Sequence, residues 1–274
     1  MPELPEVETV VRALNASLPG KTVSAVCSMG KLRLPFDAGD LTRRLAGRKI
    51  LGVRRRAKYI LVDFPGQLAL LAHLGMTGRF RLETTGTPGQ KHDRVAFLFE
   101  DGSELRYSDA RRFGFIKLAC LPRPGGFPGD LERLGPEPLE RSFTGDVLLA
   151  SAAGRKAPVK TFIMDQKIVV GVGNIYASEA LYGAGINPAR PAGLLSPAEW
   201  RRLAAEIKGV LRRAIRKGGS TIRSYQTVAG TEGGFQRSLR VYGKTGGECP
   251  RCGGRIESTR LGGRSTFFCP GCQV

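Results

Sequence analysis

Four cysteines near the C-terminal end constrain this chain more than any other feature. They form two Cys-x-x-Cys pairs with sixteen residues between the pairs. Two such pairs can surround one tetrahedral zinc ion on a short two-stranded ribbon, and Gly253-Gly254 and Gly262-Gly263 can form its turns. The alternative, two redox pairs, is disfavoured because a thioredoxin-like motif belongs near a βαβ unit. We therefore predict one structural zinc ion, whose ligands are Cys249, Cys252, Cys269 and Cys272.

The charge of the chain indicates a polyanionic partner. Its 274 residues include 43 Lys and Arg against 24 Asp and Glu, a net charge of +19. Lysine and arginine neutralise phosphates and release their counterions, so nucleic acid is the expected partner. The competing partner is an anionic membrane, but no apolar stretch is long enough to span a bilayer, and we expect no membrane partner. The segment from Arg237 onward contains seven basic and two acidic residues, a net charge of +5. Four thiolates and one Zn²⁺ together contribute −2, so the segment keeps a net charge of +3. Arg264 falls at the predicted tip of this ribbon.

The N-terminus carries no signal-peptide pattern. Residues 1–6 have neither a basic start nor an apolar core segment, so we expect a cytoplasmic, nucleoid-associated protein. Disulfides are rare in that compartment. The two cysteines outside the ribbon, Cys27 and Cys120, are expected to be ordinary half-buried thiols.

Periodicity divides the chain into a strand-rich half and a helical half. Apolar residues at helical spacing predict a leading helix from Pro5 to Leu18. Short strands separated by turn dipeptides follow up to about residue 121 and are typical of an antiparallel sandwich or barrel. The expected strands are Tyr59–Phe64, Leu68–Leu74, Arg94–Glu100, Glu104–Ser108 and Phe113–Leu118.

A Pro- and Gly-rich linker over 122–129 separates this half from the helical part. The clearest helix there starts with a capping box between Ser196 and Glu199 and ends at Gly218-Gly219. A shorter helix is expected from Asn174 to Leu181. The glycine-rich stretch from Thr221 to Gln236 is either a functional loop or a floppy connector. We place three domains at 1–130, 131–236 and 237–274.

Three segments together resemble a known family. They are the N-terminal Pro2-Glu-Leu-Pro-Glu-Val-Glu8, the Gly171-Val-Gly-Asn-Ile-Tyr-Ala-Ser-Glu179 stretch and the terminal ribbon. They resemble formamidopyrimidine-DNA glycosylase, and the resemblance covers essentially the whole chain. It implies an α+β fold with an N-terminal antiparallel β-sandwich, a helix–two-turn–helix domain and a zinc ribbon.

The resemblance also implies an activity. The family is a DNA-formamidopyrimidine glycosylase and DNA-(apurinic or apyrimidinic site) lyase of base excision repair. We therefore expect a monomer that acts on double-stranded DNA containing oxidised purines or abasic sites. The related endonuclease VIII, which prefers oxidised pyrimidines, is the alternative within the fold. A non-catalytic zinc-ribbon DNA-binding protein is the alternative in another class.

The chemistry implied by the resemblance centres on the N-terminus. If Met1 is removed, Pro2 presents an amine that titrates near ~8 and is nucleophilic at neutral pH. The family uses this amine to attack the sugar C1′, form an imine and cleave the strand by β,δ-elimination. Glu3 becomes the general acid/base and Glu6 a further active-site carboxylate. The simpler interpretations are that Pro2 only promotes removal of Met1 and that Glu6 only complements the helix dipole.

The remaining site residues are expected to hold DNA. By resemblance Lys58 contacts the phosphates around the lesion, and Arg264, at the predicted ribbon tip, is placed to enter a groove of the DNA. Both are counted with the catalytic residues. A flipped nucleotide leaves a hole in the duplex. The resemblance implies that Met76, Arg111 and Phe113 fill this hole, whereas the simpler interpretation is that Met76 and Phe113 are core residues. The predicted DNA-binding residues are Lys58, His73, Met76, Arg111, Arg112, Phe113, Asn174, as the cap of a phosphate-binding helix, and Arg264. The 221–236 loop is expected to cover the flipped base.

Overall fold

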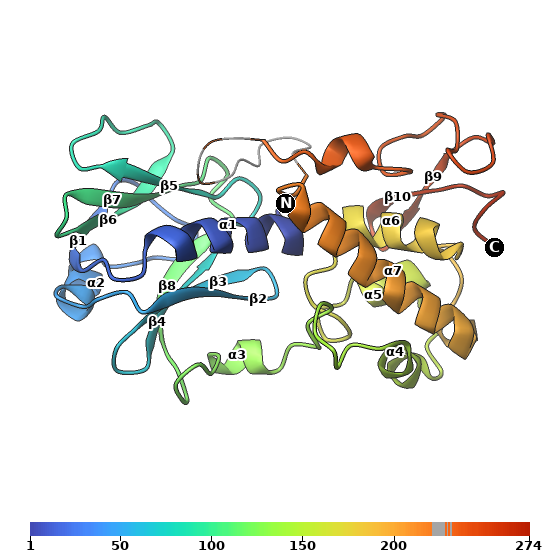
Figure 1. Ribbon diagram of the computed structural model, residues 1–274, viewed down its shortest axis with the longest axis horizontal. Helices are drawn as coiled ribbons and strands as arrows, with labels where there is room; N and C mark the ends of the chain where they lie inside the picture. Colours follow the sequence, from blue (N-terminus) through green and yellow to red (C-terminus); the bar gives the residue numbers. More distant parts are fainter. Residues whose placement is uncertain (221–227, 229, 231) are drawn as a thin grey trace. The chain divides into compact units, whose positions relative to one another are not determined.

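The computed structural model describes residues 1–220, 228, 230 and 232–274 (Figure 1). The chain forms two compact units. The first contains Met1–Glu132 and Gly218–Gly234, and the second contains Arg133–Lys217 and Phe235–Val274. The division therefore assigns 218–234 to the N-terminal unit and keeps the ribbon with the helices. The predicted cover loop falls largely outside the described residues, because 221–227, 229 and 231 are not among them.

The first unit begins with α1 (Leu4–Ser17), within one residue of the predicted helix at each end. Glu3 and Glu6 form a reciprocal capping box, and Pro5 lies in the first turn, where its missing N–H costs nothing. One face of the helix buries four apolar side chains in the core of this unit: Val7, Val10, Val11 and Leu14.

The described part of this unit contains two four-stranded antiparallel sheets, which confirms the predicted sandwich (Figure 1). Apolar side chains of both sheets and of α1 share one core. One sheet has the order β1-β6-β7-β5, formed by Val23–Ser28, Asp93–Phe99, Ser103–Ser108 and Arg79–Thr84. The other has the order β2-β3-β4-β8, formed by Gly52–Arg56, Tyr59–Phe64, Leu68–His73 and Phe115–Cys120. Two short helices, α2 (Ala38–Leu45) and α3 (Gly129–Glu132), complete the unit.

Four elements of this unit, β1, β2, β5 and α2, were not predicted from the sequence. In β2 the reason is charge, since three consecutive arginines do not look like a strand. The structure pairs Arg54 with Asp63 across the β2–β3 ladder at 2.6 Å and Arg55 with Glu8 of α1 at 2.9 Å. Cys27 and Cys120 are exposed, not half-buried, because their side chains lie away from the core.

The second unit is helical and ends in the ribbon. Ser196 caps α7 through its side chain and exchanges hydrogen bonds with Glu199, which confirms the predicted capping box. The described elements are α4 (Gly145–Ala152), α5 (Val159–Ile163), α6 (Asn174–Ala184), η1 (Ala192–Leu194), α7 (Pro197–Arg216), η2 (Phe235–Ser238), β9 (Glu257–Leu261) and β10 (Arg264–Phe268). Among the residues that the structure describes, none forms a helix long and apolar enough to cross a membrane.

Candidate active site and zinc centre

The N-terminus of the chain is held by one buried carboxylate. Glu6, only 1 % exposed, accepts a hydrogen bond from the Glu3 backbone N–H at 2.8 Å and one from the Ser220 N–H at 2.7 Å. Gly219 has a φ of +81°, and a Cβ there would lie 2.9 Å from the Glu6 carboxylate. Glu6 therefore fixes both the Pro2-Glu3 end and the start of the 218–234 segment, which is a more specific role than a first-turn charge.

Pro2 and Glu3 are buried beside this carboxylate, whereas Met1 is 52 % exposed. The helix that follows them, α1, is linked to β2. Asn15 accepts a hydrogen bond from the Val53 N–H at 2.7 Å, and this contact adds to the Glu8–Arg55 ion pair. The position of the N-terminal residues is thus set by the sheet beneath the helix.

The same ion pair positions Lys58. The Arg55 guanidinium, paired with Glu8, also donates to the Ala57 carbonyl at 2.9 Å. Ala57 has a φ of +54° and forms with Lys58 the two-residue turn between β2 and β3. Lys58 is 8 % exposed, so this candidate phosphate ligand is held by the fold and does not extend freely into solvent.

His73 ends β4 among aromatic rings. Its ring lies 5.1 Å from that of Tyr59 and 5.9 Å from that of Phe115, and its Nδ1 accepts a hydrogen bond from the Gly75 N–H at 3.1 Å. Burial, aided by the charge of Lys58, lowers the pKa of His73 from 6.5 to about 4. At neutral pH the ring is therefore uncharged, with its proton on Nε2 as a donor.

This pKa predicts an acid-dependent loss of stability. Between pH 6.5 and pH 4, His73 is protonated in the unfolded chain but remains neutral in the folded chain. Protonation therefore favours the unfolded state, and the free energy of unfolding falls as the pH falls. The loss amounts to about 3 kcal/mol in total. We expect His73→Phe to remove this part of the pH dependence in urea unfolding at pH 7 and pH 4. His92→Gln, at the exposed second histidine, should keep it; an unchanged pH dependence in His73→Phe would contradict the assignment.

Two loops of the first unit are interlocked by Asp109, which is fully buried. One of its oxygens contacts the Thr77 hydroxyl at 2.5 Å and the Arg111 N–H at 3.2 Å, and the other accepts from the Gly114 N–H at 2.8 Å. Gly75 has a φ of +58°, and a Cβ there would lie 2.4 Å from the Gly114 nitrogen. Loops 74–78 and 109–114 therefore form one rigid edge.

This edge presents the side chains that the resemblance assigns to the hole in the duplex. Phe113 is 43 % exposed and Arg111 is exposed, with its guanidinium 4.8 Å from the Phe113 ring. Met76 is half-buried, and Arg112 is exposed with a φ of +55°. Phe113 is thus not a core residue. β8 begins only at Phe115, a correction to the predicted strand start, because Asp109 holds 109–114 in a loop.

The four ribbon cysteines meet at one point. Their sulfurs lie within 4.8 Å of one another; Cys252 and Cys269 are 3.5 Å apart and Cys249 and Cys272 3.9 Å apart. Tetrahedral Zn–S bonds of about 2.3 Å place the sulfurs about 3.8 Å apart, so the cluster fits one zinc ion. Four thiolates leave no open coordination position, and the zinc is structural, as predicted.

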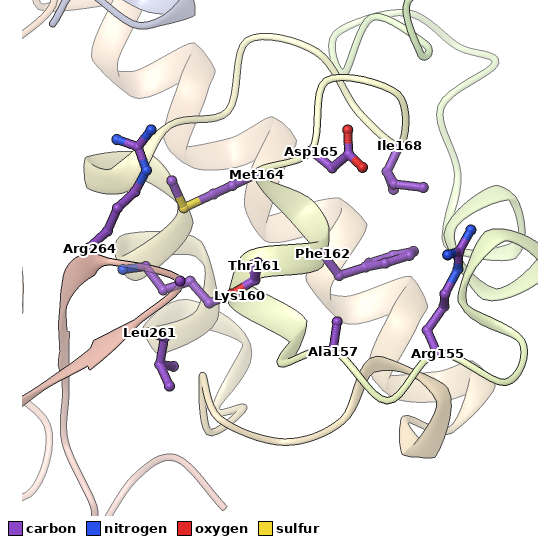
Figure 2. A pocket seen from close by; sticks show the side chains of 11 residues that line it. Arg155, Ala157, Lys160, Thr161, Phe162, Met164, Asp165, Ile168, Leu261 and Arg264 are labelled. Carbon is purple, nitrogen blue, oxygen red and sulfur yellow. The ribbon is translucent and has the colours of Figure 1, made fainter.

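Arg264 is exposed and opens β10 directly after the Gly262-Gly263 turn. It borders a pocket of about 410 Å³ between α5 and the β9–β10 turn, where Figure 2 shows the Arg264 and Arg155 side chains on opposite sides. Asp165 is the one carboxylate among the lining residues. This face of the second unit is therefore predominantly basic, in keeping with an anionic partner.

A buried lysine beside this pocket joins the ribbon to the helices. Lys160 is 1 % exposed, and its Nζ donates to the Asn174 side chain at 2.6 Å, the Ser265 carbonyl at 2.9 Å and the Thr266 hydroxyl at 2.7 Å. Gly173, not Asn174, is the N-cap of α6, which corrects the predicted cap. The Asn174 side chain is used instead by Lys160 and by Ser265, whose carbonyl accepts its amide at 2.9 Å.

Glu179 of α6 holds the segment that leads into the ribbon. This buried carboxylate accepts hydrogen bonds from the backbone N–H groups of Arg240, Val241 and Tyr242 at 2.9 to 3.0 Å. In the sequence, Glu179 stands out only as the last residue of the Gly171–Glu179 stretch. A lone glutamate on a helix gives no signal that its partners lie some sixty residues away.

Replacing this carboxylate should destabilise the second unit strongly. Glu179→Ala leaves three backbone N–H groups without an acceptor, and we expect the free energy of unfolding to fall by about 3–5 kcal/mol. Glu179→Gln, which keeps one acceptor oxygen, should lose less. Urea unfolding measures both, with Glu206→Ala as control, because its contact with Arg213 is 3.9 Å long and partly exposed. If Glu179→Ala and Glu206→Ala lowered the free energy of unfolding equally, the anchoring role of Glu179 would be refuted.

Comparisons with known proteins agree with this architecture. Family models match for the formamidopyrimidine-DNA glycosylase N-terminal domain over residues 1–116, its H2TH domain over 134–226 and the zinc finger found in FPG and IleRS over 246–274. The formamidopyrimidine-DNA glycosylases of Laribacter hongkongensis and Methylococcus capsulatus are 48 % and 47 % identical, and each alignment covers 100 % of both chains. The chain belongs to the formamidopyrimidine-DNA glycosylase family.

Solved structures show the same similarity. A mutant of Lactococcus lactis FPG, in complex with DNA containing Fapy-dG, superposes with a TM-score of 0.89 at 34 % identity and 99 % coverage of both chains. The Lactococcus lactis Fpg complex with DNA containing an abasic site gives a TM-score of 0.88 at the same identity and coverage. Both units of the chain thus share their folds with structures solved on damaged DNA.

Proposed function

We propose that this chain excises oxidised purines, namely 8-oxoguanine and formamidopyrimidines, from duplex DNA and cleaves the strand at the resulting abasic site. The observation that carries this proposal is the buried Pro2-Glu3 end, which Glu6 holds at the start of α1. Supporting it, the similar Lactococcus lactis proteins were solved on DNA with a Fapy-dG lesion and with an abasic site. The reaction belongs to base excision repair.

The chemistry begins once Met1 is removed. The Pro2 nitrogen attacks C1′ of the damaged nucleotide, the bond from C1′ to the base breaks, and the departing base takes up a proton. The C1′–O4′ bond then breaks, O4′ takes up a proton, and C1′ and the Pro2 nitrogen are joined as an iminium ion, the positively charged form of the imine. The iminium ion makes the C2′ proton acidic, so its removal expels the 3′ phosphate, and a second elimination expels the 5′ phosphate. Glu3, next to the amine in sequence and buried, is the carboxylate we assign to these proton transfers.

The basic and aromatic residues position the DNA. We assign phosphate contacts to Lys58, Arg112 and Arg264 and to the neutral His73, which can donate from Nε2. The Asn174 side chain is used internally. We therefore assign its contribution to its place as the first residue of α6, where the positive end of the helix dipole favours a phosphate.

The interlocked edge fills the hole left by the flipped nucleotide. Phe113 acts as an apolar wedge, Met76 supports it, and Arg111 offers donors to the widowed cytosine and thereby rejects adenine. We assign these roles to a monomer on the nucleoid, with functional modules at 1–130, 131–236 and 237–274.

A rate comparison tests the proposed substrate class. The processed protein should cleave an 8-oxoguanine:C duplex much faster than a thymine glycol duplex of the same sequence, under single-turnover conditions. The protein should also cleave an 8-oxoguanine:A duplex more slowly than an 8-oxoguanine:C duplex. Arg111→Ala should reduce the ratio of these two cleavage rates. A clear preference for thymine glycol would instead assign the chain to the pyrimidine-specific activity of endonuclease VIII.

A further inference from the structure

Tyr182, near the C-terminal end of α6, reaches the zinc centre. Its side chain is 1 % exposed, and its hydroxyl lies 3.3 Å from the Sγ of Cys249, which is itself 2 % exposed. A zinc-bound cysteine is a thiolate and carries no proton. The hydrogen bond therefore has one direction when the metal is bound: the phenol donates and the sulfur accepts.

The packing around the ring leaves the phenol little freedom. Tyr182 belongs to a small buried cluster with Val241, Ile256 and two of the cysteines. The Arg251 guanidinium lies 4.8 Å from the ring centre and donates to the Tyr182 carbonyl at 3.2 Å. These contacts hold the ring with its hydroxyl directed at Cys249.

Packing alone does not account for a tyrosine at this position. A phenylalanine would fill the same space without bringing a polar group into a buried cluster, where an unpaired hydroxyl costs free energy. The Sγ of Cys249 pairs with this hydroxyl and also receives the Arg251 backbone N–H at 3.5 Å. A side-chain donor therefore supplements the backbone donor at this sulfur.

We propose that Tyr182 is a positioning residue of the zinc centre. Its hydroxyl donates to the Cys249 thiolate, holds the sulfur in place for the metal and draws negative charge away from a cluster of four thiolates. Hydrogen-bond partners of metal ligands commonly change metal affinity by about 10- to 100-fold when they are removed. The same contact joins the zinc site to α6, the helix that carries Asn174 and Glu179.

Tyr182→Phe removes the hydroxyl and keeps the aromatic ring, so it tests the hydrogen bond separately from the packing of the ring. In the full-length protein we expect zinc affinity, measured by competition with a chromophoric chelator, to fall by about tenfold, with faster zinc release. The matched control is Tyr242→Phe, because the Tyr242 hydroxyl faces Asn174 at 3.5 Å and its ring packs on Phe267. The control should keep the affinity of the unmodified protein.

Cobalt substitution provides a second readout that a purely structural role would not change. The sulfur-to-cobalt charge-transfer band of the Co²⁺-loaded protein should shift to lower energy in Tyr182→Phe, because a thiolate without its donor gives up electrons more easily. Far-UV circular dichroism establishes that the fold is kept, and the band position is read on the folded, metal-loaded protein. Unchanged affinity and an unchanged band in Tyr182→Phe, or equal losses in Tyr242→Phe, would overturn the proposal.

Discussion

A chain that keeps Met1 is expected to form no borohydride-trapped cross-link with a lesion-containing duplex, whereas the chain that begins at Pro2 should be trapped readily. Borohydride reduces the imine between the amine and C1′ to a stable bond, so trapping reports this intermediate directly. An acylated Pro2 nitrogen, as in the unprocessed chain, has no lone pair available for the attack. We expect the cross-link to disappear completely, the largest effect of any change considered.

The structure makes this test specific. Met1 is 52 % exposed and accessible to removal, while Pro2 and Glu3 are buried next to Glu6. N-terminal mass analysis of the same sample gives the processed fraction, and the trapped fraction should follow it. Pro2→Gly, which presents a less constrained primary amine, should be trapped less than the processed protein. Trapping by a chain proven to retain Met1 would place the nucleophile elsewhere, and absence of trapping in the processed chain would favour a non-catalytic DNA-binding protein.

Loss of the zinc ion is expected to abolish tight DNA binding. Between its two cysteine pairs the ribbon has mostly exposed strand residues and only a small apolar cluster, so it cannot fold on burial alone. In small zinc-finger peptides, zinc binding contributes about 10–16 kcal/mol to the free energy of folding. Removing it should unfold the hairpin that presents Arg264, and we expect DNA affinity to fall by at least about 100-fold through lost phosphate contacts.

Single substitutions distinguish the effect of losing the zinc ion from the effect of losing a DNA contact. Cys272→Ser should behave like the chelated protein, whereas Cys120→Ser, at an exposed cysteine of the first unit, should bind as the unmodified protein does. Arg264→Ala should keep its zinc, bind DNA more weakly and lower the slope of affinity against salt by about one. Fluorescence anisotropy at several salt concentrations measures these effects. Undiminished affinity in Cys272→Ser and Arg264→Ala would show that the ribbon does not hold DNA.

Local patterns predicted the elements that depend on neighbouring residues. Three such features were confirmed: the helix α1, the capping box at Ser196 and the paired cysteines. Each is defined by residues that are close together in the sequence or separated by a fixed spacing. The strand-rich first half and the helical second half also followed from periodicity. The basic run through β2 was not predicted as a strand, because the acids that pair with Arg54 and Arg55 come from β3 and α1.

The sequence by itself determined the zinc ligands and the class of fold, and it predicted a reactive end of the chain at Pro2. Only the tertiary structure showed that Asp109 locks two loops together, that Lys160 takes the Asn174 side chain away from capping, and that Glu179 anchors the segment that leads into the ribbon. The physical reason is the same in each case. A buried polar group must find partners, and those partners are backbone or side-chain groups that can lie far away along the chain and follow no repeating pattern.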